Sequence, residues 1–197
     1  MIFSLCILAV VMSFTWVLAP IAPRWATAGA AALVLGFAGW RAIRTGEWGI
    51  TRAALLPALG WSAALTGAGA LAISLAGSVL GTWHDRGDLW ANLVVLIPWG
   101  LGQQFVLHTV FLREAQATVS RPGGIWLAAL MFAMLHLPNP FLTVMTGIGA
   151  LAWCFIYDRY PNLLPLALSH ALLTLAILYA FDDAITGRLR VGLAYLG

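Results

Sequence analysis

Long apolar runs, separated by short polar segments, follow one another along this chain. A helix needs about 20 residues to cross the ~30 Å hydrocarbon core of a bilayer, and most of these runs approach that length. They lie at residues 1–19, 25–40, 59–83, 89–112, 125–137, 141–157 and 162–181. The pattern predicts an all-α, polytopic membrane helical bundle of about seven transmembrane helices (six to eight). No internal repeat is visible, so a single transmembrane domain is expected over 1–197.

The boundaries of these runs carry further signals. The first run has no basic segment in front of it, which predicts a retained span rather than a cleaved signal peptide. Residues 50–58, headed by Arg52, suggest an interfacial helix leading into the third span. The fifth run is short and ends at "HLPNP", where Pro138 and Pro140 force the chain out of the helix. The mixed segment 182–197 is expected to lie along the surface.

Composition supports the same class of protein. The chain is 62% hydrophobic and 9% charged, with a mean hydropathy of +0.93, whereas a soluble domain is about 25% charged. Ten tryptophans suit aromatic belts at the membrane surfaces. The net charge of +3 is small and scattered, which argues against nucleic acid as a partner. The expected partners are the lipid bilayer and other membrane protein subunits, in a bacterial inner (cytoplasmic) membrane.

Arginines are distributed unequally between the two ends of the predicted bundle. With seven spans, the loops 41–52, 113–124 and 158–161 share the side of the N-terminus and carry six arginines. The other side carries four, at Arg24, Arg86, Arg188 and Arg190. Because positively charged loops stay preferentially in the cytoplasm, a cytoplasmic N-terminus is expected.

Polar residues inside the predicted spans are histidines and glutamines. Gln103, Gln104 and His108 lie in the fourth span, His136 in the fifth and His170 in the seventh. Gln104 and His108 are four residues apart, which places them on one helix face. Polar groups in hydrocarbon are costly unless paired, so these five are expected to face one cavity. The plainer alternative is that they only join helices, by hydrogen bonds worth about 0.6 kcal/mol each.

Carboxylates, in contrast, lie only in predicted loops or at the ends of predicted spans. All seven follow this rule: Glu47, Asp85, Asp88, Glu114, Asp158, Asp182 and Asp183. A general base of the carboxylate type is therefore missing from the middle of the predicted membrane region.

Three short motifs, in order along the chain, resemble those of the CAAX prenyl endopeptidase and bacteriocin-processing family of intramembrane proteases. The family's Glu-Glu-x-x-x-Arg motif aligns with "QQFVLH" at 103–108. Its Phe-x-x-x-His motif aligns with "FAMLH" at 132–136, and its His-x-x-x-Asn motif with "HALLT" at 170–174. The resemblance covers about 90–181 and implies a helical membrane bundle with an endopeptidase site.

The residues that would carry the family's chemistry are partly replaced. Gln103 and Gln104 stand where the resemblance implies two water-activating glutamates, and a carboxamide is no useful base near neutral pH. His108 stands for the arginine and Thr174 for the asparagine, while both family histidines are present. Losing the acids and the arginine together is physically consistent, because an arginine without a counter-charge is costly in the membrane. The family-equivalent positions are Gln103, Gln104, His108, His136, His170 and Thr174, and none is confidently assigned as catalytic.

Three functions remain open at this point. The first is a proteolytically inactive relative that serves as an accessory or binding subunit of a membrane complex. The second is an active endopeptidase with altered catalytic residues, using His136 or His170 as base. The third is a cofactor site, with zinc, iron, copper or a tetrapyrrole held by His108, His136 or His170. Cys6 and Cys154 lie in different runs and lack metal-type spacing.

Two further features favour the subunit hypothesis. The segment "TGAGALAISLAG" (66–77) offers small residues that permit close approach of another helix, either a partner's or one of the chain's own. An ordered segment 182–197 would indicate either a partner or a tight contact with the rest of the chain.

Overall fold

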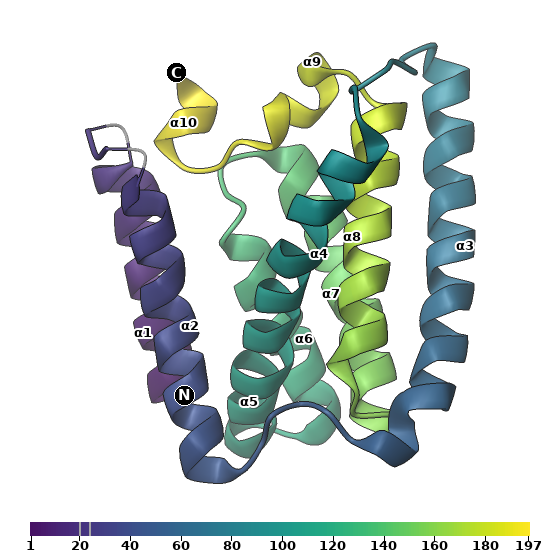
Figure 1. Cartoon of the computed structure of the whole chain (residues 1–197). Helices are drawn as coiled ribbons and strands as arrows, with labels where there is room; N and C mark the ends of the chain where they lie inside the picture. The colour runs from purple at the N-terminus through teal and green to yellow at the C-terminus, as the bar shows by residue number, and fades with distance from the viewer. Residues whose placement is uncertain (20, 24) are drawn as a thin grey trace.

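The computed structural model describes residues 1–19, 21–23 and 25–197. Arg24, which entered the count of arginines above, lies outside the described residues. The chain begins with α1 (Ile2–Ser13), which continues into the π-helical η1 (Phe14–Leu18). It returns through α2 (Trp25–Thr45) to the end of the bundle where it began (Figure 1).

The remaining long helices complete the bundle. A 3-10 turn, η2 (Arg52–Ala54), leads into α3 (Leu55–Leu80). The next helical stretch runs through α4 (Leu89–Phe105), the π-helical η3 (Val106–Leu112) and α5 (Arg113–Thr118). Then come α6 (Arg121–Met134), α7 (Pro140–Arg159) and α8 (Leu163–Ala180). The tail contains α9 (Asp183–Thr186), the 3-10 turn η4 (Gly187–Leu189) and α10 (Leu193–Leu196).

The predicted all-α membrane bundle is confirmed. Among the residues that the structure describes, five helical stretches are long and apolar enough to cross a bilayer: Trp25–Thr45, Arg52–Leu80, Leu89–Thr118, Pro140–Arg159 and Leu163–Ala180. The other two predicted spans are helical but shorter. The first run forms the apolar helix Ile2–Leu18, and the fifth forms the 14-residue α6, which ends at Met134, just before the predicted break.

The prediction of an interfacial helix over 50–58 was wrong. Only the 3-10 turn η2 precedes α3, and the two form one continuous stretch, Arg52–Leu80. Pro57 does not interrupt it, since a proline in the first turn of a helix removes no hydrogen bond that the helix needs. Ile50 instead forms an isolated antiparallel bridge with Asn162. Thr51 N donates to the Pro161 carbonyl at 3.0 Å, which ties this segment to the connection between α7 and α8.

Helix α8 lies between α3 and α4 and packs against both (Figure 1). In its most apolar window 56% of residues are buried, against 11% for the stretch that contains α3. Glycines bring its neighbours close. A Cβ added at Gly77 of α3 would lie 2.6 Å from the Ala180 carbonyl oxygen, and one at Gly100 of α4 would lie 3.0 Å from that of Ala167. The small residues of α3 at Gly69 and Gly77 thus pack against the chain's own α8, whereas Gly67 faces open space.

The C-terminal tail lies across one end of the bundle, as predicted for a surface segment (Figure 1). It is anchored by the fully buried Asn139, the N-cap residue of α7. Asn139 Oδ1 accepts from Leu142 N at 3.0 Å, while Nδ2 donates to the carbonyls of Thr186 and Arg190 at 2.9 and 3.1 Å. Gly192 N also donates to the Leu137 carbonyl at 2.8 Å. A tight contact within the chain therefore accounts for the order of the tail.

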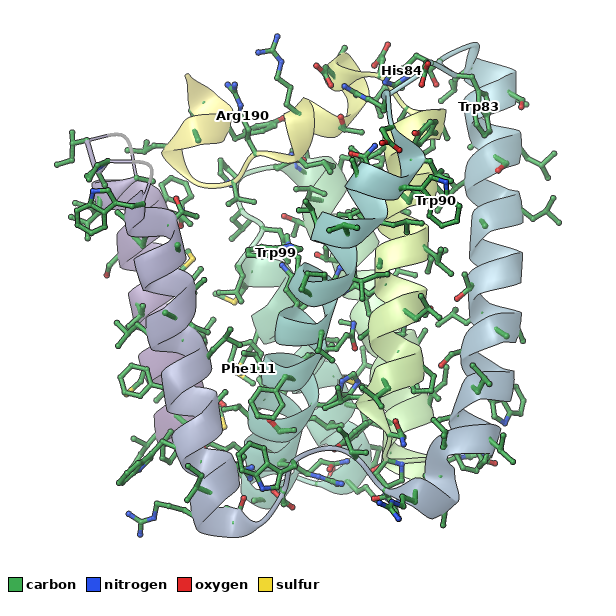
Figure 2. The ribbon with its side chains drawn as sticks, in the orientation of Figure 1. Trp83, His84, Trp90, Trp99, Phe111 and Arg190 are labelled. Carbon is green, nitrogen blue, oxygen red and sulfur yellow. The ribbon has the colours of Figure 1, made fainter. Side chains whose placement is uncertain are left out.

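Tryptophans mark the same end of the bundle. Trp83 and Trp90 lie beside His84, where α3 ends and α4 begins (Figure 2). Both indole rings are exposed, at 49% and 72%. Exposed tryptophan near a helix end is typical of the interface between membrane and water, which supports a bilayer around the long helices.

Candidate functional site

The first polar pair of the site comes from the long stretch that begins with α4. Asp88 caps this helix by accepting from Trp90 N and Ala91 N at 2.8 and 3.3 Å. Gln104 and His108 follow on one face, and both side chains are fully buried. The helix becomes π-helical just between them, at Val106, a local departure that often accompanies functional sites. His108 Nδ1 donates to the Gln104 carbonyl oxygen at 2.9 Å.

A hydrogen bond joins this pair to α8. Gln104 Nε2 and His170 Nδ1 are 3.1 Å apart, and both side chains are buried. Because an amide nitrogen is only a donor, His170 Nδ1 accepts and the proton of the neutral ring lies on Nε2. Gly100, one turn before Gln104, permits this approach, since a Cβ there would lie 3.0 Å from the Ala167 carbonyl and 3.7 Å from His170 Cβ. The close crossing of α4 and α8 is therefore what brings the two polar groups together.

His136 lies just beyond the end of α6 and is half-buried. Its Nδ1 donates to the Phe132 carbonyl at 2.9 Å, so Nε2 carries the free lone pair. The Phe132 ring lies beside two histidines, with centroid distances of 5.2 Å to His136 and 6.3 Å to His170. The Phe132 ring thus lies next to both His136 and His170.

Two aromatic residues of α7 pack against the buried histidines, and both were missed from the sequence. The Trp153 ring stacks on His170 at 4.7 Å, and its Nε1 donates to Ser169 Oγ at 3.2 Å. The Tyr157 ring lies 4.3 Å from that of His108. The signal that could have found them is their spacing, because two aromatic residues four apart share one face of a helix.

Contacts thus connect four of the six family-equivalent positions: Gln104, His108, His136 and His170. Gln103 and Thr174 are half-buried, and neither side chain forms a hydrogen bond within the described residues. That all of these side chains face one cavity stays a prediction.

Two buried atoms of this cluster are unpaired. Gln104 Oε1 and His108 Nε2 form no hydrogen bond of acceptable geometry in the part of the chain that the structure describes. A buried polar atom without a partner costs about 1–3 kcal/mol, and native interiors leave few of them. Gln104 Oε1 thus has no partner among the described residues, whereas the backbone carbonyl of Trp153 lies close to the His108 ring.

No carboxylate is hydrogen-bonded to the three histidines within the described residues. Glu114, on the same helical stretch as His108, accepts instead from Ser4 N and Ser4 Oγ at 2.8 and 2.7 Å. Asp158, at the end of α7, pairs with Arg121 at 2.9 Å. Among residues 1–19, 21–23 and 25–197, no three His, Cys, Asp or Glu side chains are grouped so that they could hold a metal ion. The three histidines are therefore not grouped as ligands of one metal ion within the described residues.

Comparison with known families agrees with the motif resemblance. Residues 85–176 match the model of the type II CAAX prenyl endopeptidase Rce1-like family. No curated protein and no solved structure matches the chain. The matched segment runs from the connection before α4 into α8 and contains Gln104, His108, His136 and His170. Residues 85–176 of this multi-pass membrane chain are therefore similar to the Rce1-like CAAX prenyl endopeptidase family.

Proposed function

We propose that this protein is an Rce1-like membrane protein that binds a hydrophobic polypeptide segment without cleaving it, as a subunit of a membrane assembly. The observation that supports this most strongly is the buried Gln104 Oε1, which forms no hydrogen bond within the described residues. A site kept only for packing would be more stable with an apolar group at this position, because an unpaired buried atom costs free energy. A polar atom that is buried yet unpaired suits a site that is completed by a ligand.

The type of the polar groups favours binding over hydrolysis. Gln104 offers one amide donor and one carbonyl acceptor, and a carboxamide has no useful basicity. Its donor is used by His170 and its acceptor is left for a ligand. A polypeptide backbone in the membrane presents N–H groups that such an acceptor can bind. The site can therefore recognise a peptide segment while lacking the carboxylate that would activate water.

Endopeptidase activity with a histidine base is the second candidate, and one observation favours it. His136 is half-buried, and the hydrogen bond from its Nδ1 to Phe132 directs the basic Nε2 away from the backbone. A neutral imidazole in that state can accept a proton from water. Cleavage of a prenylated peptide by the wild-type chain, and its loss in His136→Ala, would distinguish the second candidate from the first.

The binding proposal predicts a larger particle than the chain alone. After gentle solubilisation, the wild-type protein is expected to elute with a partner, and Gln104→Met is expected to lose that partner while staying folded, because methionine keeps the shape but removes the polar atoms. The measurement is particle mass by light scattering, with identification of the co-eluting chain.

The matched control is Gly67→Leu. A Cβ at Gly67 meets nothing within 4 Å, so this change alters the open face of α3 without disturbing the fold. A wild-type protein that elutes as a monodisperse monomer would contradict the proposal. So would a partner that is lost from Gly67→Leu but kept by Gln104→Met, because binding would then be lateral rather than at the cluster.

A further inference from the structure

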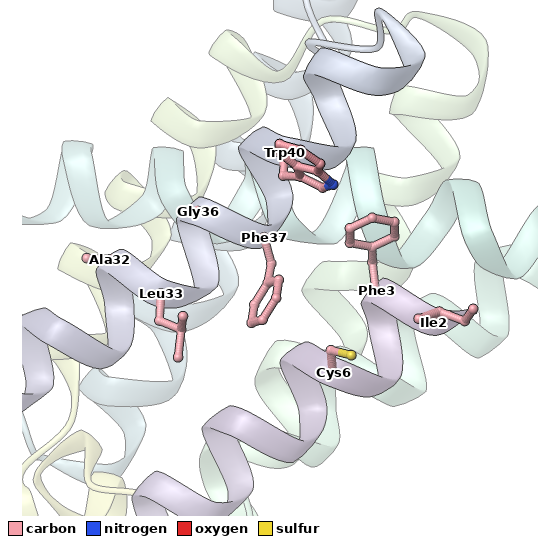
Figure 3. Close-up of a pocket in the computed structure, with 8 residues that line it drawn as sticks. All are labelled: Ile2, Phe3, Cys6, Ala32, Leu33, Gly36, Phe37 and Trp40. Carbon is pink, nitrogen blue, oxygen red and sulfur yellow. The ribbon is translucent and has the colours of Figure 1, made fainter.

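An apolar groove of about 500 Å³ lies between α1 and α2, outside the matched domain (Figure 3). Phe3 and Cys6 line it from α1, and Gly36, Phe37 and Trp40 line it from α2. Gly36 leaves room in its floor, since a Cβ added there would meet nothing within 4 Å. Helix α1 is apolar, and α2 is apolar up to Trp40, before its arginines. A groove of this composition within a bilayer is suited to a hydrocarbon chain.

A second cavity, of about 610 Å³, adjoins the groove at the end of the bundle where α2 finishes and α5 lies. The two cavities share Phe3, and the second is lined by three arginines: Arg41, Arg44 and Arg113. Arg41 is only 9% exposed, and its Nη1 is buried without a hydrogen bond within the described residues. Arg113 Nε is likewise buried without one. Unpaired guanidinium N–H groups at the end of an apolar groove indicate an anionic ligand.

The carboxylates around this cavity do not balance its arginines. Arg41 and Arg113 share the single carboxylate of Glu47, at 2.9 and 3.8 Å. Glu114 also lines the cavity, but its two oxygens are engaged by the first turn of α1, where they accept from Phe3 N, Ser4 N and Ser4 Oγ. Arg44 forms no ion pair with any described residue. Positive charge is thus left for a ligand to neutralise.

We propose that the two cavities together bind one anionic phospholipid, with an acyl chain in the groove between α1 and α2 and the headgroup phosphate at Arg41, Arg44 and Arg113. Arginine suits this role because its planar guanidinium matches phosphate in a bidentate manner. The cavity lies at the end of the bundle that carries most of the arginines, and basic pockets at the cytoplasmic membrane surface bind anionic headgroups. The second cavity is lined from both α2 and α5. A lipid bound there would therefore connect helices α1 and α2 to the matched segment 85–176.

The test uses the full chain, purified in mild detergent and stripped of lipid. Its melting temperature is measured with phosphatidylglycerol, with phosphatidylcholine of the same acyl chains, and with inorganic phosphate. Phosphatidylglycerol is expected to raise the melting temperature in a saturable manner, while the other two leave it nearly unchanged. Equal protection by the two lipids would overturn the anionic site. Equal protection by inorganic phosphate would show a bare anion site and overturn the role of the groove.

Two variants with matched controls test the two halves of the site. Arg44→Gln is expected to weaken the binding of phosphatidylglycerol by about fivefold, whereas Arg159→Gln, an exposed arginine at the same end but outside the cavity, is expected to bind as the wild type. Gly36→Leu fills the groove and is expected to weaken binding of the long-chain lipid, whereas Gly39→Leu, whose Cβ also meets open space, is not. Wild-type binding by both Arg44→Gln and Gly36→Leu would overturn the proposal.

Discussion

Replacing Asn139 by alanine is expected to lower the free energy of unfolding by about 3 kcal/mol and to release the C-terminal tail. The change removes the acceptor that caps Leu142 N. It also removes the two hydrogen bonds that Asn139 Nδ2 donates to the carbonyls of Thr186 and Arg190 in the tail. Unfolding in detergent measures the stability. Limited trypsin digestion measures the release, because the tail contains the exposed arginines Arg188 and Arg190.

Two comparisons locate the origin of this effect. Asn139→Ser keeps a capping oxygen but is too short to reach the tail, so it is expected to lose about 2 kcal/mol and to release the tail equally. Asn92→Ala removes a single long contact, 3.4 Å to the Arg86 carbonyl, and is expected to change little. If Asn139→Ala melted like the wild type and its tail resisted trypsin, the anchoring role would be refuted.

The second large effect is expected at Gly77, where α3 crosses α8. A Cβ at this position would lie 2.6 Å from the Ala180 carbonyl oxygen and 3.0 Å from Ala180 Cα. Both atoms belong to the backbone, so Gly77→Leu can be accommodated only by separating the helices, at a cost of about 3 kcal/mol or more. The separation would also break the hydrogen bond from Thr82 Oγ1 to the same carbonyl, which is 2.7 Å long. Thermal unfolding and the yield of monodisperse protein in detergent measure the loss.

Gly67→Leu is the matched control for Gly77→Leu, since it places the same side chain on the same helix in open space. It is expected to change the free energy of unfolding by less than about 0.5 kcal/mol. Similar losses for both variants would mean that α3 does not pack on α8 through Gly77.

Hydrophobic pattern was sufficient to predict the membrane bundle and the positions of its long helices, because each helix must present an apolar surface of the length of the bilayer. The pattern was less precise about where an individual helix begins. The 50–58 segment was predicted as an interfacial helix because Arg52 stands at its head, yet most of it belongs to the continuous stretch Arg52–Leu80, where Pro57 falls in the first turn of α3 and is tolerated.

The site was predictable only in part. The histidines and glutamines were visible because polar groups are rare in apolar runs, and the structure joins Gln104 to His170. Trp153 and Tyr157 were missed because aromatic residues are common in membrane helices, so that only their four-residue spacing sets them apart. The tail contacts of Asn139 could not be predicted, since its partners are the backbone carbonyls of Thr186 and Arg190, which every residue type possesses.

Restoring glutamate at positions 103 and 104 is not expected to create a protease. In the motif alignment His108 stands where the family has arginine, so we expect two buried acids there to lack a cationic partner and to stay protonated. This variant, Gln103→Glu with Gln104→Glu, therefore serves as a further control in the decisive assay.

The most direct test of the account is cleavage of a prenylated peptide, and of a hydrophobic peptide, by the purified wild-type chain in a lipid bilayer. An active Rce1-like endopeptidase assayed in parallel establishes that the substrates are competent, and His136→Ala establishes the background. The account predicts that the wild-type chain cleaves neither peptide above the rate of His136→Ala, because Gln104 cannot act as a base. Robust cleavage by the wild-type chain, lost in His136→Ala, would contradict it and establish a histidine-based endopeptidase.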